Sequence, residues 1–210
     1  MRRRARPWST EQALRAATDE KRGESSRHVC CTVIHDFTTF AREQRLDLTE
    51  VALPDFLRDL RNLWFPLATS RAIDLVVDLP PGCPPLRADE PKLRRVIENL
   101  VKNAIEAIDR GPGRVAIVTT AIPTDEKIRI SVVDTGPGIP PSLDVFGLFE
   151  TTKSDGTGLG LAVAQQIVAA HGGAIQYEQL VPNGTAFHIE LPARGPAVRG
   201  RAGAGARWGR

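Results

Sequence analysis

The order of helices and strands along the chain is the feature that most limits its fold. A strongly helical stretch at residues 88–113 is followed by pairs of short apolar strands, with a second helix between the pairs. Strands this close in the chain pair as hairpins, and hairpins build antiparallel sheets with the helices gathered on one face. The strands are expected at 114–120, 127–134, 172–179 and 184–192. The order therefore predicts an α/β (α+β) domain built as a two-layer sandwich with a mainly antiparallel sheet.

The helix at residues 88–113 is the clearest element. Asp89 is placed to cap its start, and Pro91 falls in its first turn. Its apolar residues recur at helical spacing and predict one broad buried face: Leu93, Val96, Ile97, Leu100, Val101, Ala104, Ile105 and Ile108. Asn99 and Asn103 lie one turn apart at the margin of that face. Because asparagine is a mediocre helix former, this pair indicates a role other than helix formation.

The rest of the chain divides into parts of different composition. Residues 1–24 are polar and irregular, and 25–48 have the apolar stripe of an amphipathic helix. A folded domain is expected over 49–192, with a further helix at 53–71 and a short strand from 73. The tail at 193–210 is rich in Gly, Ala and Arg, which predicts disorder.

Composition excludes several classes of protein. No run of about 18 apolar residues exists, so no membrane segment is predicted. The net charge of +3 arises largely from basic ends that lack interleaved aromatic residues, which favours solvated tails over nucleic-acid binding. Three cysteines without a CxxC pair fit a reducing, cytoplasmic compartment.

Glycines at alternate positions, Gly156, Gly158 and Gly160, stand immediately before the second helix. A helix start presents free N–H groups and a positive dipole end, and glycine lets phosphate oxygens approach the backbone. Lys153 adds a positive charge nearby. No Gly-Lys-Ser/Thr sequence is present and no parallel βαβ unit leads into the loop, which excludes the P-loop and dinucleotide-binding motifs.

The segment VVDTGPGIP places Asp134 at the end of a strand, followed by Gly136 and Gly138. By itself this segment is typical of a simple turn. A carboxylate at such a position can accept a hydrogen bond from the amino group of adenine and disfavours the carbonyl oxygen of guanine. Asn103 offers an amide oxygen, a ligand type that Mg²⁺ accepts together with water and phosphate oxygens.

Together these elements resemble the catalytic and ATP-binding domain of two-component sensor histidine kinases, in the GHKL ATPase superfamily and its nitrogen-regulator-like branch. ENLVKNAIEA looks like the N box, VVDTGPGIP the G1 box, VFGLFETTK the F box and DGTGLGL the G2 box; NGTAFHIELP resembles the closing motif. The resemblance runs from about residue 47 to 192. It implies a Bergerat-type sandwich preceded by a segment similar to the second helix of a dimerisation hairpin.

The resemblance also implies roles for individual residues. Asn103 would ligate Mg²⁺, Asp134 would bind the adenine amino group beside Gly136 and Gly138, and Thr185 would lie near adenine. The G2 box would cradle the phosphates of ATP through Gly156, Thr157, Gly158, Leu159, Gly160 and Leu161. Residues 146–156 would form a mobile lid.

Within this resemblance, the identity of residue 99 bears on whether the site hydrolyses ATP. Hydrolysing members of the superfamily carry a glutamate one helical turn before the Mg²⁺ asparagine, and here that position is Asn99, which cannot take a proton from water. A neutral imidazole needs no such base. Asn99 and Lys153 are therefore the candidate catalytic groups of a site that holds ATP for an incoming histidine, although Glu106 lies close enough to the asparagine side to remain an alternative base.

The acceptor histidine itself is not evident. His35 is followed by an aspartate, as in many H boxes, but only about ten residues, or roughly 15 Å of helix, separate it from the break near Asp47. His171 follows a helix end, where a cationic or donor side chain suits the last carbonyls. The chain is therefore expected to lack the H-box helix and to phosphorylate a histidine from another chain or a missing segment.

The predicted function is the ATP-binding core of a protein-histidine kinase. Its expected partners are ATP, the receiver domain of a response regulator, and a second copy or a histidine-bearing kinase. Two alternatives stay open: a nucleotide-binding regulatory module without catalysis, and a serine kinase of the anti-sigma type.

Overall fold

A computed structural model describes residues 45–108, 111–151 and 157–196. The described residues divide into two compact units, a smaller one within 142–163 and a larger one made of residues up to 141 and from 164 onward. The segment predicted as a hairpin-like helix lies outside the described residues up to position 44, and residues 45–48 have no regular secondary structure. The start of the chain and its tail from residue 197 also lie outside the described residues.

The larger unit is organised around a five-stranded sheet with the strand order β2-β4-β5-β7-β6. The bounds are β2 (Ile73–Asp78), β4 (Gly113–Ile122), β5 (Lys127–Asp134), β7 (Thr185–Pro192) and β6 (Ala174–Gln179). Only β2 and β4 run parallel; the other neighbours are antiparallel. The prediction of a mixed, mainly antiparallel sheet is confirmed.

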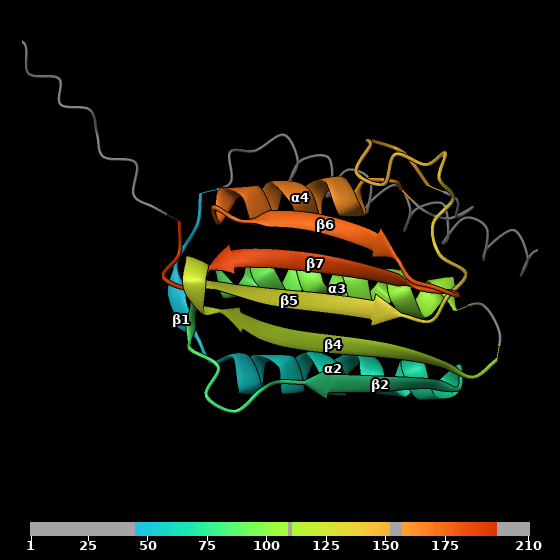
Figure 1. The fold of residues 1–210 in the computed structure, drawn as a ribbon, viewed down its shortest axis with the longest axis horizontal. Helices are drawn as coiled ribbons and strands as arrows, with labels where there is room; N and C mark the ends of the chain where they lie inside the picture. The colour runs from blue at the N-terminus through green and yellow to red at the C-terminus, as the bar shows by residue number, and fades with distance from the viewer. Residues whose placement is uncertain (1–44, 109–110, 152–156, 197–210) are drawn as a thin grey trace, which may run out of the picture. The chain divides into compact units, whose positions relative to one another are not determined.

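Helices cover one face of this sheet. Figure 1 shows α2 (Leu53–Ser70) and α3 (Glu90–Ala107) behind the strands, with the opposite face toward the viewer. All eight apolar residues predicted for the buried face of the central helix are buried, and they meet inward-facing side chains of the sheet such as Ile117, Ile128 and Ile130. Because burial of apolar area is the main driving force for folding, this layer of side chains stabilises the two-layer arrangement.

Three elements complete the described residues. A short pair of strands, β1 (Thr49–Val51) and β3 (Leu86–Ala88), forms a separate antiparallel sheet that the sequence pattern did not predict. A single 3₁₀ turn, η1 (Pro123–Asp125), connects β4 to β5. The helix α4 (Gly160–Ala170) starts at the last glycine of the glycine cluster. None of the helices in this part of the chain has the length and apolar character needed to cross a bilayer.

Two buried polar side chains join the start of α3 to the residue that follows α4. The side chain of Asp89 accepts a hydrogen bond from the backbone N–H of Lys92, so the predicted N-cap is confirmed. His171 Nε2 accepts from the backbone N–H of Asp89 at 3.0 Å, and His171 Nδ1 donates to the carbonyl of Ile167 at 2.8 Å. Only a neutral imidazole donates through one nitrogen and accepts through the other. His171 is therefore a neutral link between two helices and not a cationic cap.

This link predicts how stability depends on pH. Burial lowers the pKa of His171, so below the ordinary value of 6.5 the unfolded chain takes up a proton that the folded chain resists. We expect the full free energy of unfolding above pH 6.5 and a decline as the pH falls below it. His171→Ala should lose about 1–3 kcal/mol at neutral pH, because Asp89 N–H loses its buried acceptor. Urea denaturation at several pH values measures both effects.

His188→Ala is the matched control, since that imidazole is only partly buried and lies on a strand. The assignment is wrong if the His171→Ala variant keeps the same decline of stability below pH 6.5 as the wild type.

Candidate functional site

Asp134, the predicted adenine-binding residue, ends the central strand β5 and is only 4% exposed. Its Oδ1 accepts a hydrogen bond of 2.8 Å from the backbone N–H of Gly136. Burial raises the pKa of Asp134, although backbone hydrogen bonds from Gly136 and Thr185 oppose that shift. A carboxylate has about four acceptor positions, so acceptor capacity remains beyond these two bonds.

Thr185, also predicted near adenine, lies beside Asp134. The two residues are paired in register between β5 and β7, and Thr185 is 3% exposed. Gly136 follows two residues after Asp134 and is fixed by the hydrogen bond to its side chain. The structure thus brings three of the predicted residues together at one end of the sheet.

Gly138 lies against a residue that the sequence reasoning missed. Its φ is +87°, and a Cβ there would collide with the side-chain amide of Gln179, the last residue of β6. The Gln179 side chain forms two hydrogen bonds with the backbone of Ile139, one as acceptor and one as donor. A lone glutamine in an exposed strand carries no signal for this contact in the sequence.

The asparagine pair lies on α3 as predicted. Asn99 is half-buried, and its Nδ2 is a buried donor without a hydrogen-bond partner among the described residues. Asn103 is half-buried on the next turn. Glu106, the alternative base, is within 3.8 Å of Lys102 Nζ. The Asn99 Nδ2 donor is therefore available to an acceptor atom at this face of α3.

A metal ion at Asn103 would need ligands from elsewhere. No three His, Cys, Asp or Glu side chains gather around a possible metal site in the part of the chain that the structure describes. One amide oxygen fits Mg²⁺ only when phosphate oxygens and water complete the octahedron. The amide oxygen of Asn103 therefore fits a magnesium ion that is bound together with a nucleotide.

The smaller unit holds the glycine cluster. Gly158 has φ +64°, and a Cβ there would collide with the backbone of Phe149, whose N–H donates to the Gly158 carbonyl at 3.1 Å. Thr157 Oγ1 accepts from Leu159 N–H at 3.3 Å, and Gly160 is the first residue of α4. The requirement for glycine at 158 thus includes a close approach of the chain to itself, which the sequence reasoning did not foresee.

Three predicted residues fall outside the described part of the chain: Lys153, Gly156 and the low-ranked acceptor His35. Leu161, in contrast, lies in the first turn of α4 and is half-buried. The roles predicted for Lys153, Gly156, His35 and Leu161 therefore stay predictions.

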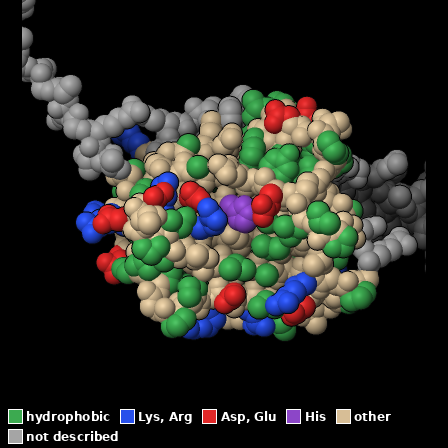
Figure 2. Space-filling view, viewed as in Figure 1, with side chains coloured by type: hydrophobic (Ala, Val, Ile, Leu, Met, Phe, Trp, Pro, Cys, Tyr) green, Lys and Arg blue, Asp and Glu red, His purple; other side chains and the backbone are tan. Residues whose placement is uncertain are grey.

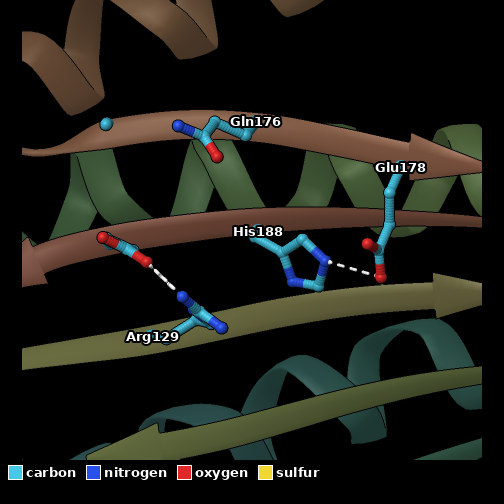
Figure 3. Close-up of a pocket in the computed structure, with 6 residues that line it drawn as sticks. Arg129, Gln176, Glu178 and His188 are labelled. Carbon is cyan, nitrogen blue, oxygen red and sulfur yellow. Dashed lines mark hydrogen bonds and ion pairs between the residues drawn. The ribbon is translucent and has the colours of Figure 1, made fainter. Parts of the chain in front are cut away.

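A shallow pocket of about 230 Å³ lies apart from these residues, on the open face of the sheet. Figure 2 shows a histidine there between acidic and basic side chains, and Figure 3 shows His188 beside Glu178, with Arg129 and Gln176 nearby. Ser131 Oγ and His188 Nδ1 are 2.8 Å apart, and His188 Nε2 lies 3.4 Å from Glu178 Oε1. None of the predicted site residues lines this pocket.

Comparison with known proteins identifies the family. The family model described as "Histidine kinase-, DNA gyrase B-, and HSP90-like ATPase" matches residues 88–195, just over half of the chain. The chain belongs to this family. Its membership confirms the resemblance drawn from the N, G1 and G2 boxes, all of which fall within the matched residues.

Individual relatives are sensor histidine kinases. Sensor histidine kinase ZraS of Klebsiella oxytoca is 35% identical over 167 residues, which is 78% of this chain and 35% of that protein. The catalytic domain of histidine kinase ThkA, in a nucleotide-free form, superimposes with a TM-score of 0.64 at 34% identity, covering 70% of this chain and 96% of that one. ThkA in complex with the response regulator TrrA gives a TM-score of 0.72 at 28% identity, covering 89% of this chain and 53% of that one. The chain spans little more than a third of the length of ZraS.

The burial of Asp134 predicts that replacing its carboxylate has opposite effects on protein stability and on nucleotide affinity. Because burial disfavours the ionised carboxylate, Asp134→Asn should leave the melting temperature unchanged or raise it. The same change replaces an acceptor oxygen with a donor, so the affinity for ATP should fall by about tenfold or more. Calorimetric titration and a thermal melt of the two proteins measure both quantities. A variant that melts earlier and still binds ATP normally contradicts the assignment.

Proposed function

We propose that this chain is the ATP-binding catalytic core of a protein-histidine kinase in two-component signalling. In this proposal it transfers the γ-phosphoryl group of magnesium–ATP to a histidine side chain. The observation that carries the proposal is the buried carboxylate of Asp134 at the end of the central strand, held by backbone N–H groups with acceptor capacity left over. In an ATPase family, such a carboxylate is suited to select adenine.

Asn103 is proposed as the protein ligand of Mg²⁺, which when bound neutralises charge on the phosphates. The segment from Thr157 to Leu161, which leads into the first turn of α4, is proposed to cradle those phosphates together with Gly156, because helix starts present free N–H groups to anions. Lys153 adds positive charge in this proposal. Phosphoryl transfer depends mainly on positioning and charge neutralisation, and these groups supply both.

Asn99 supports a histidine acceptor in preference to water. An amide cannot remove a proton from water, whereas its buried Nδ2–H can donate to a phosphate oxygen. A neutral imidazole nitrogen attacks phosphorus with its own lone pair and releases ADP. The proposed site therefore hydrolyses ATP slowly and keeps it bound until an acceptor histidine enters the site.

The acceptor and partners follow from the same proposal. The histidine is supplied by another chain or by a further segment, with His35 as a weaker candidate. Similarity to ThkA, which is found in complex with a response regulator, supports a receiver domain as the next phosphoryl acceptor. A homodimer, a cytoplasmic location and the division at residues 25, 49 and 193 stay predictions of the sequence.

Transfer of label from γ-labelled ATP tests the proposal. With Mg²⁺ and a histidine-bearing helical hairpin, we expect an acid-labile phosphoryl group on the hairpin. Asn103→Asp should slow the transfer by about tenfold or more, the scale seen when groups that orient a metal are removed. Lys102→Gln is the matched control, since Lys102 is exposed on the neighbouring position of α3 and its ion pair spans 3.8 Å.

Three other outcomes would each overturn the proposal in a distinct way. An acid-stable label on a partner serine indicates a serine kinase, and ATP binding without transfer to any partner indicates a regulatory module. Unchanged transfer in both Asn103→Asp and Gly158→Ala shows that the site residues are wrongly assigned.

A further inference from the structure

We propose that Gln179 is a positioning residue that fixes the segment after Asp134 and thereby sets the selection of adenine. This inference rests on the proposed nucleotide site. Gln179 ends β6, an edge strand of the sheet, while the segment it contacts follows β5, two strands away in the order β5-β7-β6. The contact therefore joins parts of the sheet that backbone pairing leaves separate.

The contact between Gln179 and Ile139 is two-sided. Gln179 Oε1 accepts from Ile139 N–H at 3.2 Å, and Gln179 Nε2 donates to the carbonyl of Ile139. A primary amide carries both a donor and an acceptor in the plane of one group, as a backbone peptide does. The Gln179 side chain thus bonds the N–H and C=O of Ile139 as the backbone of a neighbouring strand would. An ionised carboxylate has no donor and cannot satisfy both backbone groups in this way.

Gly138 and Gln179 are matched in shape. Gly138 adopts φ +87°, which favours glycine, and any Cβ at this position would collide with the Gln179 amide. The space that glycine leaves is the space that the amide occupies. The positive φ favours glycine at position 138, and a Cβ there would displace the Gln179 amide from its contact with Ile139.

Both ends of the segment from Asp134 to Ile139 are consequently held. At the first end Asp134 is paired with β4 and β7, and its Oδ1 accepts from Gly136 N–H. At the second end Gln179 fixes Ile139. Without that second contact, the loop gains freedom, and Gly136 N–H no longer has a fixed direction relative to the carboxylate. The acceptor oxygens of Asp134 would then lose their set orientation toward a base.

The experiment compares three substitutions on β6 in the full chain. Gln179→Ala removes both hydrogen bonds, Gln179→Glu keeps the acceptor for Ile139 N–H and turns the donor into a repelling oxygen, and Gln176→Ala is the matched control. Gln176 is the same residue type on the same strand, but it lines the pocket on the open face of the sheet (Figure 3). Calorimetric titrations use the magnesium complexes of ATP, ADP and GTP.

We expect Gln179→Ala to weaken ATP and ADP binding by a similar factor of roughly three- to tenfold, the scale of two partly exposed hydrogen bonds. Because the change acts on the base, the ratio of the ATP and ADP dissociation constants should stay as in the wild type, while the preference for ATP over GTP should fall. Gln176→Ala should match the wild type in all these values.

Gln179→Glu adds a second measurement, the pH dependence of ATP affinity, which would not change if Gln179 only supported the fold. Protonation of the new carboxyl restores the donor, so its ATP affinity relative to the wild type should recover as the pH falls from about 7 toward about 4, the range in which a glutamate side chain of ordinary pKa takes up its proton. The same recovery decides the question if Gln179→Ala does not fold.

Failure of this inference is distinguishable from failure of the proposed function. A wild-type chain that does not bind magnesium–ATP overturns the proposed site itself. A wild type that binds, together with Gln179→Ala that binds and discriminates equally well, overturns only the role of Gln179. Equal losses in Gln179→Ala and Gln176→Ala, or a Gln179→Glu variant without the pH-dependent recovery, overturn it as well.

Discussion

A carboxylate buried at the end of the central strand is the constraint on which the rest of the site depends. Ionised Asp134 is costly at 4% exposure, and the fold lowers that cost with backbone N–H groups from Gly136 and Thr185. Those donors exist only because β7 pairs with β5 in this register and because the chain turns immediately after Asp134. The two-layer packing, the register and the turn together hold an acceptor group at a buried position where its ionised form is disfavoured. Such a cost is expected where function requires the group.

Much of the fold could be predicted because its signals are local. The apolar period of α3, its capping aspartate and the closely spaced strands all lie within short windows of sequence, and each was found in the structure. The short sheet of β1 and β3 could not be predicted in this way. Its two strands have three residues each and lie far apart in the chain, so neither has enough alternation to mark it, and only their pairing reveals them.

In the candidate site, too, residues with a local sequence signal were predicted and residues defined by tertiary contacts were not. Asn99 and Asn103 were identified because paired asparagines are unusual in a helix, and Asp134 because it ends a strand before two glycines. Thr185 was named only through the resemblance to the family's closing motif. Gln179 was missed, since one glutamine in a strand is unremarkable until its partner is known. His171 was predicted as a cationic or donor side chain at the end of its own helix, and its acceptor role depends on Asp89, which lies 82 residues away. Contacts of this kind depend on tertiary structure, and the residue types alone do not encode them.

The central claim, that Asp134 selects adenine, is tested most directly by comparing ATP with inosine triphosphate, in which a carbonyl oxygen replaces the adenine amino group. Titration of the wild-type chain with the two magnesium complexes compares an amino group with a carbonyl oxygen at C6 of the base, a change that also places a proton on N1. The account predicts that inosine triphosphate binds at least about tenfold more weakly, because an acceptor would face the Asp134 carboxylate. Equal affinities for the two nucleotides would contradict it.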